Sequence, residues 1–125
     1  MKNLNNPLSP HLQVYKPQIT SVLSILHRLT GVYLSLSIFF ISYWLFSIFL
    51  GQDFYYSSLP FLKSSILKFL YIFWFFCFSY HLFNGVRHLL WDFGYGFSHK
   101  EITTSGLVVI FLSVISTISL TFILI

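Results

Sequence analysis

One histidine, His81, lies inside an apolar stretch, residues 69–86, that carries no charged side chain. The sequence then adds Arg87, His88 and Asp92 within one to three helical turns. Ionisable groups inside a membrane-spanning segment are costly, so they usually face a helix bundle and serve as an ion path, a proton relay or a cofactor ligand. Because no acidic residue lies close to His81 in the sequence, the role of cofactor ligand suits this imidazole best.

The spacing around His81 favours a b-type haem with this imidazole as an axial ligand of the iron. His88 follows seven residues later, about two helical turns, so both imidazoles are expected on the same side of the helix. Gly85 lies between them and removes side-chain bulk where a macrocycle edge would approach the backbone. We expect His27, Arg28 and His88 at the level of the haem propionates. The alternative is a His81 that only hydrogen-bonds a neighbouring helix.

The second axial ligand is expected from another chain. Asp92 is expected at the membrane interface, which puts His81, about 16 Å away along the helix axis, near the middle of the bilayer. The other histidines lie toward one membrane face; they are His11, His27, His88 and His99. A haem iron with two histidine ligands would therefore bridge two polypeptides.

A quinone site is predicted near the start of the first long apolar segment. Ser24 and Arg28 are four residues apart and share a helix face. A quinone head has two carbonyl acceptors and becomes anionic on one-electron reduction, so a hydroxyl beside a guanidinium would hold and polarise it. Asp92 could pair with Arg28. In the alternative interpretation, Arg28 and Arg87 extend to the membrane interface and Ser24 bonds its own backbone.

The composition indicates an integral membrane protein. Of the 125 residues, 56% are hydrophobic, 22% are aromatic and 8% are charged, whereas soluble domains carry about a quarter charged residues. Spans of about 20 apolar residues cross a bilayer, and the chain has room for three. The sequence predicts an all-α protein with three transmembrane helices, at residues 21–50, 63–90 and 102–125. The remaining segments are an N-terminal stretch at 1–20, an outer connection at 51–62 and an inner connection at 91–101.

Basic residues predict the orientation in the membrane. Five of them share the N-terminal side, at Lys2, Lys16, Arg28, Arg87 and Lys100, and two lie on the other side, at Lys63 and Lys68. The positive-inside rule therefore puts the N-terminus in the cytoplasm or the mitochondrial matrix. The prolines near the N-terminus and the length of the first apolar run do not suit a cleavable signal peptide. The basic residues form no patch for nucleic acid.

The third predicted helix carries hydroxyl groups in place of charges. Ser113, Ser116 and Thr117 fall at positions i, i+3 and i+4, a face typical of helix-to-helix packing in membranes. A channel or transporter would place polar groups along the whole path through the bilayer. Because the charged groups here gather in the inner half, the pattern argues against that class.

Two motifs resemble the succinate dehydrogenase cytochrome b subunit family. The first is PLSPHL at residues 7–12 with YKP at 15–17 and SILHRLTG at 24–31. The second is His81 followed by GVRHLLWDFGY at residues 85–95. The resemblance covers nearly the whole chain, and its order and spacing agree with the family.

This resemblance implies a membrane anchor of respiratory complex II that catalyses nothing alone. It implies haem b on His81, with His27 and Arg28 near the propionates, and a ubiquinone site with Ser24, Arg28 and Asp92. The implied partners are a smaller anchor subunit that gives the second haem ligand, an iron-sulfur subunit and a flavoprotein subunit. The implied location is the mitochondrial inner membrane or a bacterial plasma membrane. The alternatives are a fumarate reductase anchor and a structural anchor without cofactor.

Overall fold

The computed structural model describes residues 18–124 of the chain. This part of the chain contains four helices. They are α1 (Ile19–Phe49), α2 (Gln52–Leu62), α3 (Ser65–Asp92) and α4 (His99–Leu124). Of these described helices, α1, α3 and α4 are long and apolar enough to cross a membrane. The predicted all-α fold with three spanning helices is thereby confirmed. The expectations for His11 and for the rest of residues 1–17 lie outside the described residues.

The outer connection at residues 51–62, expected to be a short connection, contains the helix α2. Gly51 starts it from a backbone φ of 101°, which glycine adopts without a steric penalty. Asp53 lies in the first turn, where a carboxylate is favoured. Gly51 and Pro60 led us to expect a break in any helix here. Pro60 lies in the last turn of α2, so its missing N–H removes only one backbone hydrogen bond of that helix.

The inner connection is shorter than predicted because α4 begins earlier. Ser98 and Glu101 form a capping box: the Ser98 hydroxyl accepts from the Glu101 backbone N–H at 3.3 Å, and Glu101 Oε2 accepts from the Ser98 N–H at 3.1 Å. This cap starts α4 at His99. Gly94, with φ of 88°, makes the turn after α3. The turn and the cap bring α3 and α4 side by side.

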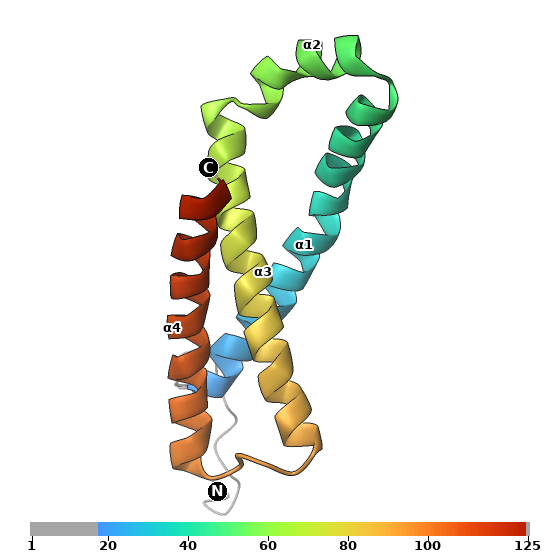
Figure 1. The fold of residues 1–125 in the computed structure, drawn as a ribbon. Coiled ribbons are helices and arrows are strands. Elements are labelled where there is room, and N and C mark those ends of the chain that lie inside the picture. The colour runs from blue at the N-terminus through green and yellow to red at the C-terminus, as the bar shows by residue number, and fades with distance from the viewer. Residues whose placement is uncertain (1–17, 125) are drawn as a thin grey trace, which may run out of the picture.

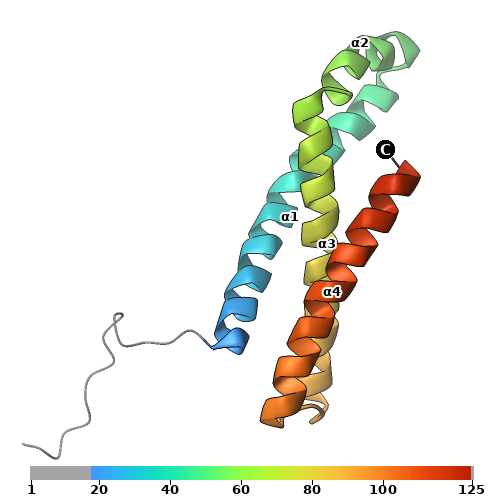
Figure 2. The same cartoon turned by 90° about the vertical axis from the view of Figure 1, so that its left-hand side faces the viewer.

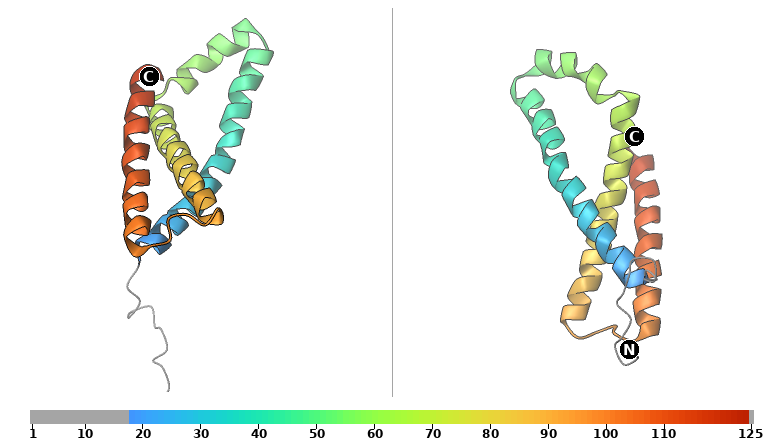
Figure 3. Two further views of the ribbon diagram at one scale, coloured as in Figure 1. Left: turned by 60° about the horizontal axis from the view of Figure 1, so that its bottom comes forward. Right: turned by 180° about the vertical axis from the view of Figure 1, so that it is seen from behind.

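Of the three long helices, α3 lies between α1 and α4 (Figure 1). We call the end at which α3 joins α4 the inner end, and the end that carries α2 the outer end. α4 runs alongside α3, as the side view also shows (Figure 2). α1 crosses α3 near the inner end and diverges from it toward α2, which bridges the gap (Figure 3). A cavity of about 860 Å³ lies among α1, α2 and α3, lined by Tyr33, Ser37, Trp44, Tyr71 and Trp74.

The buried core is small and lies where all three long helices meet. Leu23 of α1, Tyr80 of α3 and Val109 of α4 are each at most 5% exposed. The Tyr80 hydroxyl donates to the Leu23 carbonyl at 2.9 Å, which ties α3 to α1. On α4, Ser113 and Thr117 are buried and bond their own helix, as expected for a packing face. The core therefore fixes the inner end of α1 against both neighbours.

Large apolar side chains are exposed along every spanning helix. Those on α1 and α4 include Phe39, Phe49, Phe111 and Phe122, of which Phe122 is 86% exposed. A soluble protein would hide so much apolar surface from water. In a membrane it is solvated by lipid or covered by other helices.

Candidate functional site

Three imidazoles meet where α1 crosses α3. The rings of His27 on α1 and His81 on α3 stack at 3.9 Å between centroids, with 10° between their planes. His88, two turns along α3, lies 5.4 Å from the His27 ring at a tilt of 55°. The fold therefore brings together the three histidines that the sequence analysis selected.

Hydrogen bonds fix the tautomer of His81. Its Nδ1 lies 3.1 Å from the backbone carbonyl oxygen of His27 and 3.2 Å from Thr30 Oγ1. A carbonyl oxygen can only accept, so Nδ1 carries the proton and Nε2 keeps its lone pair. Metal-bound histidines are oriented in the same way, with the second ring nitrogen donating to a backbone carbonyl or carboxylate. This imidazole is thus prepared to act as a ligand through Nε2.

A glycine makes room for the His81 ring. A Cβ atom added at Gly31 of α1 would lie 3.0 Å from His81 Cε1, which is tighter than ordinary van der Waals contact. Gly85 was expected to leave a flat space beside His81. In the structure a Cβ there would lie at 3.8 Å from His27 Cε1, so the imidazole of His27 occupies part of that space. Gly31 therefore limits the position of His81 more strongly than Gly85 does.

The structure places His27 closer to His81 than the sequence analysis expected. We expected His27 near the inner face and His81 near the middle of the bilayer, yet their rings are in contact. This contact arises because α1 crosses α3 at that level. Stacked rings hold their lone pairs in parallel planes, so they cannot approach one iron from opposite sides in this arrangement. Nδ1 of His27 is buried without a hydrogen-bond partner among the described residues.

The predicted quinone residues lie at the inner end but are not joined to one another. Ser24 is half-buried on α1, and Arg28 and Asp92 are exposed. Within residues 18–124 the structure records no ion pair between Arg28 and Asp92, so their expected pairing is not formed in this chain alone. Ser24 directly follows Leu23 of the buried core, which fixes the backbone at that point.

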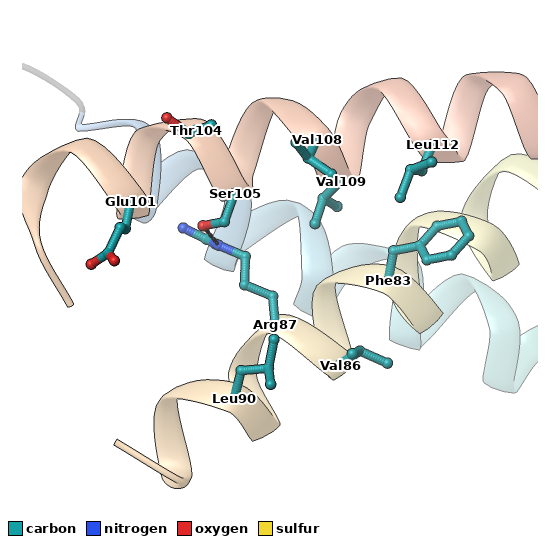
Figure 4. Close-up of a pocket in the computed structure, with 10 residues that line it drawn as sticks. All are labelled: Phe83, Val86, Arg87, Leu90, Glu101, Thr104, Ser105, Val108, Val109 and Leu112. Carbon is teal, nitrogen blue, oxygen red and sulfur yellow. Dashed lines mark hydrogen bonds between the residues drawn. The ribbon is translucent and has the colours of Figure 1, made fainter. Parts of the chain in front are cut away.

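Three residues near the histidines were missed as individual candidates. Thr30 contacts His81 Nδ1, and Gly31 makes room for the His81 ring. Both could have been found from the sequence, because they lie three and four residues after His27 and so share its helix face. Arg87 was considered as a side chain that extends to the interface, and this interpretation is wrong for Arg87 because the residue is only 4% exposed. Its side chain points to α4 (Figure 4).

Fold and site together define a class: a helical membrane protein with three spanning helices, one of which presents an imidazole nitrogen. Among the described residues no group of three histidine, cysteine or acidic side chains is placed to chelate a metal ion.

Comparisons with known proteins agree with this class. The sequence profile of the family described as succinate dehydrogenase/fumarate reductase transmembrane subunit matches residues 2–120. The chain is similar to the succinate dehydrogenase cytochrome b556 subunits of Rickettsia bellii, at 46% identity, and Rickettsia prowazekii, at 44%; each alignment covers 91% of this chain and 89% of the relative. The cytochrome b560 subunit of Marchantia polymorpha is 40% identical over 86% of this chain and 82% of its own. The chain belongs to the succinate dehydrogenase/fumarate reductase transmembrane subunit family.

Proposed function

We propose that this chain is the cytochrome b membrane anchor of a succinate dehydrogenase and that it binds haem b through Nε2 of His81. The hydrogen bond from His81 Nδ1 to the His27 carbonyl carries the haem part of the proposal, because it leaves Nε2 unprotonated. The printed names of the relatives carry the assignment to succinate dehydrogenase. A bound haem b supplies a one-electron carrier inside the membrane.

The residues around His81 fit this group. Gly31 accommodates the ligand ring, and Thr30 orients it. His27 has a buried nitrogen without a partner among the described residues, so a propionate oxygen would satisfy it. His88 lies beside His27 at the inner end and completes the polar side of the site. The second axial ligand would come from the smaller anchor subunit.

Ubiquinone reduction is the second part of the proposal. Arg28 is exposed at the inner end of α1, and the half-buried Ser24 lies one turn before it. The Ser24 hydroxyl would donate to one quinone carbonyl, and Arg28 would stabilise the negative charge that develops on reduction. Asp92 would orient Arg28 once another subunit closes the site. This chain supplies the membrane side of that pocket and no electrons of its own.

The partners are those that the family resemblance implies, and the exposed surface and the charge distribution support where each would bind. The smaller anchor subunit would cover part of the apolar surface of α1 and α3. The iron-sulfur and flavoprotein subunits would bind at the inner end, where the exposed cations Arg28 and Lys100 lie. That end would face the mitochondrial matrix or the bacterial cytoplasm.

Replacing His81 tests the haem assignment. In the assembled complex, His81→Leu should abolish haem binding, because leucine offers no lone pair to iron. The Soret absorbance of the purified complex measures this loss. His99→Leu, an exposed histidine at the start of α4, is the matched control and should keep the spectrum. Full haem content in His81→Leu would favour a structural anchor in which this residue binds no cofactor.

Replacing Arg28 tests the quinone site. Arg28→Ala in the assembled complex should lower succinate-driven quinone reduction by about two orders of magnitude, as expected when a charge-stabilising donor is lost. Reduction of an artificial acceptor that takes electrons upstream should stay unchanged. Lys100→Ala is the control for a general loss of positive charge at the inner end. Unaltered quinone reduction in Arg28→Ala would remove Arg28 from the site.

A further inference from the structure

Arg87 of α3 is a buried cation at the junction of α3 and α4. It is 4% exposed, and its guanidinium makes three hydrogen bonds. Nε donates to Ser105 Oγ at 3.0 Å, Nη2 donates to the Ile102 carbonyl at 3.0 Å, and Nη1 donates to Asn84 Oδ1 at 3.3 Å. In Figure 4 the Arg87 side chain reaches across the groove between α3 and α4 toward Ser105. Two of its three acceptors therefore belong to α4.

No carboxylate neutralises this guanidinium within residues 18–124. All three of its hydrogen-bond acceptors are neutral oxygens. Glu101 lines the same groove, but it is exposed and its carboxylate accepts from Ser98. Burying an unpaired charge costs several kcal/mol, whereas an apolar residue would fill the space at no such cost. The charge of Arg87 thus needs a reason other than packing.

Arg87 is placed to act on the histidines. It precedes His88 in the sequence, and six residues, about 9 Å of helix rise, separate it from His81. Its guanidinium carbon lies 4.1 Å from the centroid of the Trp91 ring. The same ring has His88 at 5.0 Å and Phe97 at 6.4 Å between centroids. Inside a helix bundle few mobile ions are present to screen the charge of Arg87.

Small residues on α4 hold the cation in place. A Cβ at Gly106 would lie 2.6 Å from Leu23 Cδ1 and 3.8 Å from Arg87 Nη2, so this glycine lets α1 and Arg87 approach the same turn of α4. Ser105 is half-buried and also donates to the Ile102 carbonyl at 3.2 Å. The inner turns of α4 therefore act as a fixed acceptor for the guanidinium.

We propose that Arg87, held by Ser105 and the Ile102 carbonyl of α4, is a positioning residue whose fixed positive charge raises the reduction potential of the haem on His81. The inference rests on the proposed function. Reduction adds an electron to the haem, and a nearby cation stabilises the more negative of the two states. Through Ser105 and the Ile102 carbonyl, α4 thus contributes to tuning the redox centre.

Charge-changing variants of the assembled complex test this role by optical redox titration. Arg87→Gln should lower the midpoint potential, and Arg87→Lys, which keeps the charge, should restore most of it. Equal potentials in Arg87→Gln and the parent complex would overturn the proposal. A midpoint potential of Arg87→Lys as low as that of Arg87→Gln would also overturn it, and so would loss of haem from Arg87→Lys. Either result would mean that the shape of the arginine side chain, and not its charge, affects the haem.

A second pair of variants keeps the test valid if Arg87→Gln does not assemble. Ser105→Asp places a carboxylate against the guanidinium and should lower the potential relative to Ser105→Asn, which has nearly the same shape. Thr103→Asp adds the same charge at an exposed position of α4 and should leave the potential unchanged. Equal potentials in the two Ser105 variants, or loss of haem from both, would overturn the proposal. A parent complex without haem would instead refute the proposed function, and this inference with it.

Discussion

The face of α3 that meets α1 and the face that meets α4 use polar residues differently. Toward α1, His81 and His88 gather around His27, and one ring nitrogen of His27 stays unpaired among the described residues. Toward α4, the polar side chain of Arg87 is held by three hydrogen bonds. The α1 face leaves an imidazole nitrogen open to a ligand, whereas the α4 face uses hydrogen bonds to hold Arg87 against α4. Asn84 Nδ2, beside Arg87, also has no partner among the described residues.

The largest expected effect comes from closing the space at the ligand face. Gly31→Leu should displace the His81 ring, because even a Cβ would come within 3.0 Å of it, and haem content should fall by an order of magnitude or more. Soret absorbance per assembled complex measures the change. Gly85→Ala is the control, since its new methyl group meets His27 at an ordinary 3.8 Å. Equal haem content in both variants would contradict a greater role for Gly31.

A smaller effect is expected from the residue that orients the ligand. Thr30→Val removes the hydroxyl beside His81 Nδ1 while keeping the shape, and should weaken haem binding about tenfold, as is typical of partners behind a metal ligand. Haem titration into complex depleted of haem measures the affinity. Thr30→Ser keeps the hydroxyl and should bind like the parent. An affinity unchanged in Thr30→Val would show that the His27 carbonyl alone orients the ring.

The smallest effect is expected at the packing face. Tyr80→Phe removes the hydrogen bond to the Leu23 carbonyl and should cost about 1 kcal/mol of stability, seen as a thermal transition lower by a few degrees. The haem spectrum should stay unchanged. Tyr71→Phe is the control, because no hydrogen bond of its hydroxyl is recorded within the described residues. A changed haem spectrum in Tyr80→Phe would mean that the packing of α3 against α1 also affects the haem site.

Much of this fold could be predicted from composition and periodicity. Three apolar runs fix three spanning helices, because a backbone in lipid must satisfy its hydrogen bonds internally. The helix α2 was missed because Gly51 and Pro60 were taken as breaks. Gly51 is the N-cap of α2, and Pro60 lies in its last turn, where it removes only one backbone hydrogen bond. The start of α4 was placed too late because the Ser-x-x-Glu spacing of the capping box at residues 98–101 was not used.

The candidate site was predicted unevenly. Periodicity of 3.6 residues was enough to put His81 and His88 on one side of α3, because that relation is local. The stacking of His27 on His81 could not be predicted, since it depends on where α1 crosses α3. The role of Gly31 could not be predicted either, because the absence of a side chain there matters only when the His81 ring of α3 packs against it.

The sequence by itself determined the membrane class, the helical periodicity and the choice of His81 as the proposed ligand, because apolar length and spacing along one helix are properties of the local chain. The tertiary structure decided which atoms of those residues are hydrogen-bonded and which remain available to a ligand. The crossing of α1 over α3 brings the His27 carbonyl to His81 Nδ1 and so leaves the lone pair on Nε2. The packing of α4 turns Arg87 from an expected surface cation into a buried one. Contacts between distant segments depend on helix packing, which no single stretch of sequence specifies.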